Sequence, residues 1–436
     1  MRSATRLGAI LFLLASGLPV LAQTSNRRVI HEQDPSAVEL QQLLSTAQDA
    51  VNRKDFAAAA DAYQKYLAIK PDEPTVHFDL GYSYTALGRA ADARGEFQKA
   101  IELDPKMADA YASLGLLETD SDPAAAVATL NKLVELRPDE ARSHALLGMA
   151  LDRAGKPADA ATEYQAALKI DPKDYDAHLA LARSLFNAKR YAEAETEFRA
   201  AQAIHASDPA LSLGLAECLE AQNKTAEAAD AFAAYLAAAP GDAPVRVERA
   251  ALLVKLQKYD EALAELDRAA KPGPETLRSL KLRAQICFAT NQYAAAIPVL
   301  QRAIALDQGD ASLPELLGRA YFETRDYAHA SDALVAALNR NPSSMDILRE
   351  LTAAEYLNQN YGAALHGLEL MEKRQPLTAA NWFIRATCYD KLGEAAQALD
   401  AYKKFLQLNT DLNSDSYFEA SSRARTLTRE LQEKKR

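Results

Sequence analysis

The stretch Gly81–Pro105, GYSYTALGRAADARGEFQKAIELDP, contains the pattern that decides the fold. Counted back from Pro105, a large aromatic residue (Phe97) stands eight positions earlier, an alanine (Ala93) twelve earlier and a glycine (Gly81) twenty-four earlier. The same spacing returns along the chain in steps of about 34 residues, and the step that ends at Pro138 is one residue shorter than the others. Such a step is long enough for two short helices and two turns, so the chain is predicted to be a repeat protein.

The alanine position is the most regular feature of the repeat. All eleven units have alanine there: Ala59, Ala93, Ala126, Ala160, Ala194, Ala228, Ala262, Ala296, Ala330, Ala364 and Ala398. The position four residues later always holds a large apolar or aromatic side chain, and the position of Gly81 holds a small residue, with Thr352 the largest exception. Small residues let helices approach closely while large ones fill the gap beside them. The pattern predicts an all-α fold of stacked helix pairs.

Turn-forming residues mark the junctions between the expected helices. Proline ends most units, and it cannot continue a helix interior, so we predict a boundary between units there. Glycine and asparagine tolerate the positive φ that commonly ends a helix. These residues stand in the middle of several units, at Gly88, Gly155, Asn223, Asn291 and Gly393.

The pattern resembles the tetratricopeptide repeat (TPR). Three sets of residues in this chain are similar to the family pattern. They are Gly81-Tyr82-Ser83-Tyr84 with Ala93, Phe97, Ala100 and Pro105; Gly148 with Ala160, Tyr164, Ala167 and Pro172; and Trp382 with Ala386, Tyr389, Ala398 and Tyr402. Eleven such units run over residues 40–412. The resemblance implies a right-handed α-solenoid in which the first helix of each unit lines a concave groove. Residues 413–436 follow as a capping helix, since apolar residues lie on one face of this segment and mostly polar ones on the other.

The N-terminal segment, residues 1–22, has the pattern of a secretory signal. Arg2 and Arg6 precede an uncharged run from Leu7 to Ala22, and Val20-Leu21-Ala22 is typical of a cleavage site. The alternative is a membrane anchor, but a spanning helix needs about 20 apolar residues and this run is shorter. We therefore predict cleavage after Ala22, a polar lead and helix start over residues 23–39, and a periplasmic or secreted, bacterial location.

Net charge and cysteine content narrow the classes of partner. The full chain has a net charge of −10, and loss of two arginines with the signal leaves 48 basic against 60 acidic residues, or −12. A net acidic surface disfavours nucleic acid and anionic membranes as main partners, and no later segment is apolar for long enough to cross a bilayer. Cys218, Cys287 and Cys388 stand among helical apolar neighbours, where we expect buried free thiols.

The sequence shows no catalytic motif. GxxxxGK[ST], GxGxxG, HExxH and GxSxG are all absent, so neither an enzyme nor a cofactor is predicted. His77, His144 and His178 share one position in separate units. A metal ion needs its ligands to converge on one point, so we expect these rings to pack in the structure and predict no metal site.

Groove-facing positions carry a recurrent aromatic and basic pattern. On the resemblance, they lie two, five, nine and twelve residues into each unit. The candidate peptide-binding residues are Arg183 and Phe186, then Lys281, Gln285 and Phe288, then Arg319 and Phe322, then Arg349 and Tyr356, and finally Phe383. Aromatic faces offer contact area at low entropic cost, and basic groups pair with a carboxylate or a peptide carbonyl. The alternative is that the aromatics pack against the neighbouring helix and the charges are solvated.

Two functions are consistent with this pattern. The leading hypothesis is a non-catalytic scaffold that holds extended segments of partner proteins in its groove, as an assembly factor for a cell-envelope complex. The alternative is an envelope module that binds glycan or a cell-wall enzyme, because aromatic faces also stack on sugars.

Overall fold

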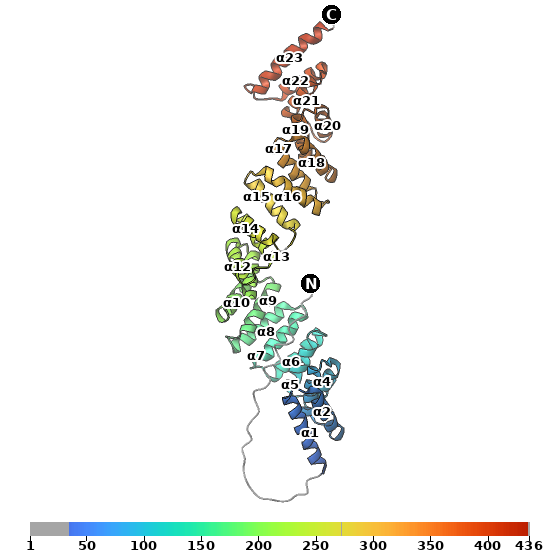
Figure 1. The fold of residues 1–436 in the computed structure, drawn as a ribbon, viewed down its shortest axis with the longest axis vertical. Coiled ribbons are helices and arrows are strands. Elements are labelled where there is room, and N and C mark those ends of the chain that lie inside the picture. Colours follow the sequence, from blue (N-terminus) through green and yellow to red (C-terminus); the bar gives the residue numbers. More distant parts are fainter. Residues whose placement is uncertain (1–34, 272, 435–436) are drawn as a thin grey trace. The chain divides into compact units, whose positions relative to one another are not determined.

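The structure is a computed structural model that describes residues 35–271 and 273–434. The predicted signal peptide, residues 1–22, and residues 23–34 lie outside the described residues. The chain divides after Ala154 into two compact units, and the boundary falls in a turn between two helices. The described part of the first unit contains α1 (Pro35–Asn52), α2 (Phe56–Ile69), α3 (Pro74–Ala86), α4 (Ala90–Leu103), α5 (Ala108–Glu118), α6 (Pro123–Leu136) and α7 (Ala141–Arg153) (Figure 1).

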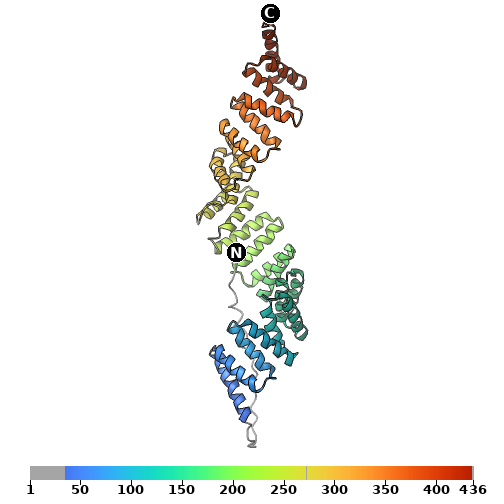
Figure 2. The same ribbon diagram turned by 90° about the vertical axis from the view of Figure 1, so that its right-hand side faces the viewer.

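The second unit continues the same alternation of helices and short turns (Figure 2). Its described residues contain α8 (Pro157–Ile170), α9 (Tyr175–Asn187), α10 (Tyr191–Ile204), α11 (Pro209–Ala221), α12 (Thr225–Ala238), α13 (Ala243–Lys255), α14 (Tyr259–Ala270), α15 (Leu277–Ala289), α16 (Tyr293–Leu306), α17 (Ser312–Glu323), α18 (Tyr327–Arg340), α19 (Met345–Leu357), α20 (Tyr361–Glu372), α21 (Ala379–Lys391), α22 (Ala395–Leu408) and α23 (Asp415–Glu433).

Within each unit, every helix packs on the next one along the chain. The residues that the structure describes form helices and turns without a β-strand. The prediction of an all-α fold of stacked helix pairs is therefore confirmed. That all eleven repeats form one continuous solenoid stays a prediction.

The repeated alanines lie where helices approach most closely. All eleven alanines, from Ala59 to Ala398, are completely buried. The large residues four positions later are also buried. The small residue on the first helix faces that large side chain: a Cβ atom on Gly81 would lie 2.7 Å from the ring of Phe97. A side chain at position 81 would overpack this contact, which is a physical reason for the small residues at the equivalent position of other repeats.

The largest exception to this pattern, Thr352, is compensated on the facing helix. Thr352 is buried in α19, and its hydroxyl donates a hydrogen bond of 2.7 Å to the carbonyl of Leu348. A Cβ atom on Gly367 of α20 would lie only 2.2 Å from the Thr352 Oγ1 atom. The extra volume in one helix is therefore balanced by a missing side chain in the other.

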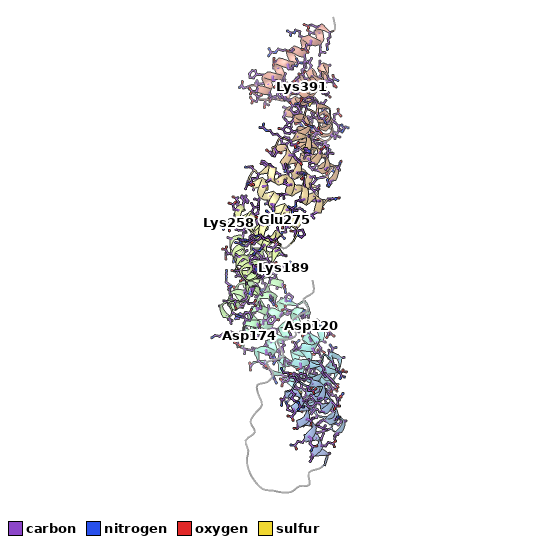
Figure 3. The ribbon with its side chains drawn as sticks, in the orientation of Figure 1. Asp120, Asp174, Lys189, Lys258, Glu275 and Lys391 are labelled. Atoms are coloured by element: carbon purple, nitrogen blue, oxygen red, sulfur yellow. The ribbon has the colours of Figure 1, made fainter. Side chains whose placement is uncertain are left out.

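In ten of the eleven repeats, the turn between the two helices has a left-handed residue at a fixed position. As predicted, Gly88, Gly155, Gly393, Asn223 and Asn291 have positive φ. The same conformation occurs at five positions where residue type gave no signal: Lys54, Lys189, Gln257, Arg325 and Gln359 (Lys189 is labelled in Figure 3).

Backbone hydrogen bonds explain why this residue is needed. At Gly88 the amide donates to the Thr85 carbonyl (3.0 Å), and the following Arg89 amide donates to Tyr84 (2.8 Å). This pair of bonds is the Schellman motif, which satisfies the last carbonyls of a helix. The third repeat, which is one residue shorter, has no left-handed residue between α5 and α6.

The last helix and the cysteines complete the core of the second unit. α23 packs on α22 and buries Ala420 and Leu427. Cys218, Cys287 and Cys388 are buried free thiols, as predicted, and burial raises the pKa of Cys218 and Cys388 to about 12. Among residues 35–271 and 273–434, the helices are too short or too polar to cross a bilayer.

Candidate functional site

Four of the predicted groove residues line one cavity of about 480 Å³ in the second unit. We call it the aromatic cavity. Its walls come from α15 to α19 and consist of Phe288, Tyr293, Arg319, Phe322, Glu323, Leu334, Arg349, Glu350 and Ala353. The predicted members are Phe288, Arg319, Phe322 and Arg349, so the structure brings together side chains from three successive repeats.

The aromatic residues of this cavity are held by partners in their own repeat. Phe288, near the end of α15, meets Tyr293, the first residue of α16, edge to face with 5.4 Å between ring centroids. The same pair recurs as Phe186–Tyr191, Phe322–Tyr327 and Tyr356–Tyr361, at 5.4, 5.5 and 6.2 Å. The partner ring therefore lies in the second helix of the same repeat, while Phe288 and Phe322 still face the cavity.

The basic groups of the cavity form ion pairs with carboxylates of the chain itself. The Arg319 guanidinium donates to Glu315 and to Glu350, both at 2.7 Å. Arg349 pairs with Asp346 at 2.9 Å, and both side chains are at least half exposed. Burial raises the pKa of Glu350, and the nearby Arg319 opposes this shift. The second oxygen of Glu350, Oε2, is buried and has no hydrogen-bond partner among the described residues.

Arg183 and Phe186 line another cavity of the second unit, of about 330 Å³. This second cavity is formed by α9, α10 and α11, and its lining residues are Arg183, Phe186, Asn187, Phe198, Ala210, Leu213, Gly214 and Glu217. A Cβ atom on Gly214 would lie 2.3 Å from the Phe198 ring, so the missing side chain leaves that ring as part of the wall. Burial and the neighbouring Glu220 raise the pKa of Glu217.

The other four candidates line neither cavity. Lys281 pairs with Asp310 at 2.7 Å, and Gln285 is exposed on α15. Tyr356 is half-buried against Tyr361. The Phe383 ring lies 5.1 Å from that of Phe405, in the apolar cluster of α21, α22 and α23. A binding role for any of the ten residues stays a prediction.

Several residues of the two cavities were not predicted from the sequence. Tyr293 could have been found, because tyrosine recurs as the first residue of the second helix, at Tyr191, Tyr259, Tyr293, Tyr327 and Tyr361. Glu350 and Gly214 share one repeat position but not a residue type, so no periodic signal marks them.

The three histidines have a structural role. In each case the ring Nε2 atom bonds the carbonyl of the proline that precedes its helix: His77 to Pro71 (2.8 Å), His144 to Pro138 (2.9 Å) and His178 to Pro172 (3.1 Å). Arg246 occupies the same position in a later repeat and donates to the Pro240 carbonyl at 2.7 Å. Each of these side chains gives a hydrogen-bond partner to a backbone carbonyl in the turn between two successive repeats.

Comparison with protein families identifies the repeat. A tetratricopeptide repeat family model matches residues 44–108, 116–175, 146–209, 179–243, 247–311 and 316–371, and a second tetratricopeptide repeat model matches residues 380–410. Among curated proteins, the chain is similar to the "Small glutamine-rich tetratricopeptide repeat-containing protein 2" of Mycosarcoma maydis, with 28% identity over 106 residues. That match covers 24% of this chain and 30% of the length of the relative.

Three solved structures are among those that match parts of this chain at low sequence identity. MamA 41-end from Desulfovibrio magneticus RS-1 is 20% identical with a TM-score of 0.38, and the match covers 39% of this chain and 97% of that one. YrrB, described as a TPR protein with an unusual peptide-binding site, is 17% identical with a TM-score of 0.39, and the match covers 46% of this chain and 100% of that one. Yeast Tom70 is 15% identical with a TM-score of 0.32, and the match covers 90% of this chain and 96% of that one. Because the family models match well over half of its residues, the chain belongs to the tetratricopeptide repeat family.

Proposed function

We propose that the chain is an exported, non-catalytic scaffold that holds an extended segment of a partner protein against its first helices. The repeat fold is that of a protein–protein interaction scaffold, and proteins of this family are generally interaction modules. The observation that carries the proposal is the aromatic cavity, which gathers aromatic and charged side chains from three successive repeats. The predicted signal over residues 1–22 supports a role in the cell envelope, where the scaffold would assist the assembly of a multiprotein complex.

The size and lining of the aromatic cavity suit a side chain of a bound segment. A volume of about 480 Å³ is within the range of small-ligand pockets, about 300–1,000 Å³. Phe288, Tyr293 and Phe322 provide rigid apolar walls, and aromatic anchors of this kind contribute most of the binding energy in many interfaces. A partner segment that crosses several first helices would place one residue in this cavity and others on neighbouring repeats.

Site-specific photo-crosslinking tests this proposal. A benzophenone amino acid is placed at Gln285, which is exposed on α15 one turn before Phe288. In a control variant it is placed at Lys99, which is exposed on α4, the second helix of its repeat. Both full-length variants are illuminated in an envelope extract of the source cells. We expect a protein to be captured from position 285 and not from position 99, and its capture to be lost with Arg319→Ala, Phe322→Ala and Arg349→Ala combined.

The other outcomes are equally informative. Equal capture from both positions would show that binding does not depend on the first-helix surface, and the proposal would be wrong. The alternative function, glycan binding, would replace it if position 285 captured no protein while the triple variant bound purified peptidoglycan less well than the parent chain. Circular dichroism melting of the triple variant serves as the folding control.

A further inference from the structure

The basic groups of the aromatic cavity are not available to an acidic ligand in the way that the sequence suggests. Arg319 is held between two carboxylates, each at 2.7 Å. Such paired hydrogen bonds fix the guanidinium and neutralise its charge. Arg349 also has an acidic partner, Asp346, although this pair is exposed and therefore weak.

Counting the charges around the cavity gives a negative balance. The two arginines, Arg319 and Arg349, face four carboxylates: Glu323 and Glu350 in the lining, and Glu315 and Asp346 as ion-pair partners. Two positive and four negative charges leave a net charge of −2. A concave site with apolar walls focuses such a potential toward its interior.

One carboxylate oxygen strengthens this potential. The Oε1 atom of Glu350 accepts a hydrogen bond from Arg319, but its Oε2 atom is buried, and no donor within residues 35–271 and 273–434 reaches it. A buried acceptor without a donor is unfavourable, so a positive charge brought nearby is stabilised more than it would be at the surface. The faces of Phe288, Tyr293 and Phe322 carry negative potential as well, which also favours a cation.

We propose that the aromatic cavity takes a lysine or arginine side chain of the bound partner segment. This inference rests on the proposed function, and it specifies the chemistry of the segment. The aliphatic stem of the side chain would pack between Phe288 and Phe322, and its charged end would lie toward Glu350 and Glu323. An acidic side chain in the same place would be repelled by the excess of negative charge.

Capped tripeptides provide a direct test. Acetyl-Ala-X-Ala-amide is prepared with X as lysine, arginine, norleucine or glutamate, so that norleucine keeps the stem and lacks the charge. Binding to the full chain is followed by NMR of ¹³C-labelled methyl groups of Leu334 and Ala353, which both line the cavity. We expect the lysine and arginine peptides to shift these signals and to bind at least about fivefold more tightly than the norleucine peptide, with glutamate weakest.

Two matched variants separate the charge of the cavity from the ion pairs of Arg319. Glu350→Gln removes the carboxylate that lines the cavity, and Glu315→Gln removes the other partner of Arg319, which lies outside the lining. We expect Glu350→Gln to reduce lysine binding to the norleucine level and Glu315→Gln to weaken it much less, because Glu315 contributes to the charge balance but does not line the cavity. Glu323→Gln, at an exposed position, should also weaken lysine binding and keeps the test informative if Glu350→Gln does not fold.

Three results would overturn the inference: tightest binding of the glutamate peptide, equal losses from Glu350→Gln and Glu315→Gln, or no shift of either methyl signal with any peptide. The crosslinking experiment distinguishes this failure from failure of the proposed function. A partner captured from position 285 through a segment without lysine or arginine would leave the scaffold function standing and the inference wrong.

Discussion

The aromatic cavity and the second cavity are lined from the same positions of the repeat, four repeats apart. Seven residues of the second cavity each stand four full repeat steps before a residue of the aromatic cavity. The pairs are Arg183 and Arg319, Phe186 and Phe322, Asn187 and Glu323, Phe198 and Leu334, Leu213 and Arg349, Gly214 and Glu350, and Glu217 and Ala353. The repeat geometry thus determines where a cavity forms.

The chemistry of the two cavities differs because five of these seven pairs differ in residue type. Where the second cavity has Gly214 against the ring of Phe198, the aromatic cavity has Glu350 near the smaller Leu334. The aromatic cavity also extends to Phe288 and Tyr293 of the preceding repeat. A small number of residue differences at equivalent repeat positions is therefore enough to make two chemically different cavities.

The largest effect is expected from moving the glutamate of one cavity into the other. Gly214→Glu places a Cβ atom about 2.3 Å from the Phe198 ring, which must then move, and it adds a charge beside an apolar wall. We expect a loss of about 3 kcal/mol in the free energy of unfolding, from overpacking and from partial burial of the carboxylate. Urea unfolding followed by circular dichroism measures it.

The aromatic cavity suggests the compensating change. Glutamate and leucine coexist there, as Glu350 and Leu334, so Gly214→Glu combined with Phe198→Leu should be more stable than the two single losses predict. A double-mutant cycle with Phe198→Leu alone gives the coupling energy. Strict additivity would show that the paired residue types in the two cavities are unrelated.

The equivalent arginines of the two cavities should differ in their importance for stability. Arg319 neutralises the half-buried Glu350, whereas Arg183 is exposed and has no ion pair within the described residues. Arg319→Met leaves the Glu350 carboxylate without its partner, so we expect a loss of about 1–2 kcal/mol. Arg183→Met should change stability by less than about 0.5 kcal/mol.

Arg349→Met is the control within the aromatic cavity, because its ion pair with Asp346 is exposed and contributes little. Thermal melting of the three variants, with the parent chain beside them, ranks the losses. If Arg183→Met were as costly as Arg319→Met, the ion pairs seen in the structure would not explain the difference between the cavities.

Much of the fold could be predicted because its determinants repeat. The alanine of each unit and the large residue that follows have to meet across one helix contact, so size alone identifies them. The compensation of Thr352 by Gly367 could not be predicted, since it depends on which atoms of two different helices touch. The left-handed residues at Lys189 and Arg325 were also missed, because these residue types do not favour positive φ and only their position in the unit does.

The candidate site was predictable only in part, for a related reason. The positions of Arg319, Phe322 and Arg349 recur in each unit, so they could be chosen from the sequence. The partners of Arg319 could not, because one of them, Glu350, belongs to the next repeat and its position is occupied by glycine four repeats earlier. The charge of the cavity follows from these partners, and it is opposite to what the arginines alone suggest.

The turns that follow α9 and α17 should lose or gain stability equally on mutation, because both have the same left-handed backbone conformation. Lys189 and Arg325 stand four repeats apart and have φ of 61° and 64°. Left-handed backbone costs a residue with a side chain about 1–2 kcal/mol more than glycine. We therefore expect Lys189→Gly and Arg325→Gly each to raise the free energy of unfolding by about 1 kcal/mol, measured by urea unfolding.

Gly155→Ala is the converse control, since it introduces a side chain at the same turn position and should lower stability by a similar amount. A gain at one of the two turns and a loss at the other would show that the backbone is not equivalent in the two regions.

The smallest effect is expected for the carboxylate that only the second cavity has. Burial and Glu220 hold the pKa of Glu217 above its usual value of 4.5, and Glu217 has no ion pair among the described residues, in contrast to Glu350 beside Arg319. The folded chain then binds the Glu217 proton more tightly than the unfolded chain, so stability from this group is present below pH 4.5 and is lost as the pH rises through the folded pKa. Glu217→Gln should therefore be slightly more stable than the parent chain at pH 7 and equal to it near pH 4. Glu227→Gln, at an exposed position of α12, is the control variant, and an equal pH dependence of the two variants would mean that the second cavity does not disfavour the charge of Glu217.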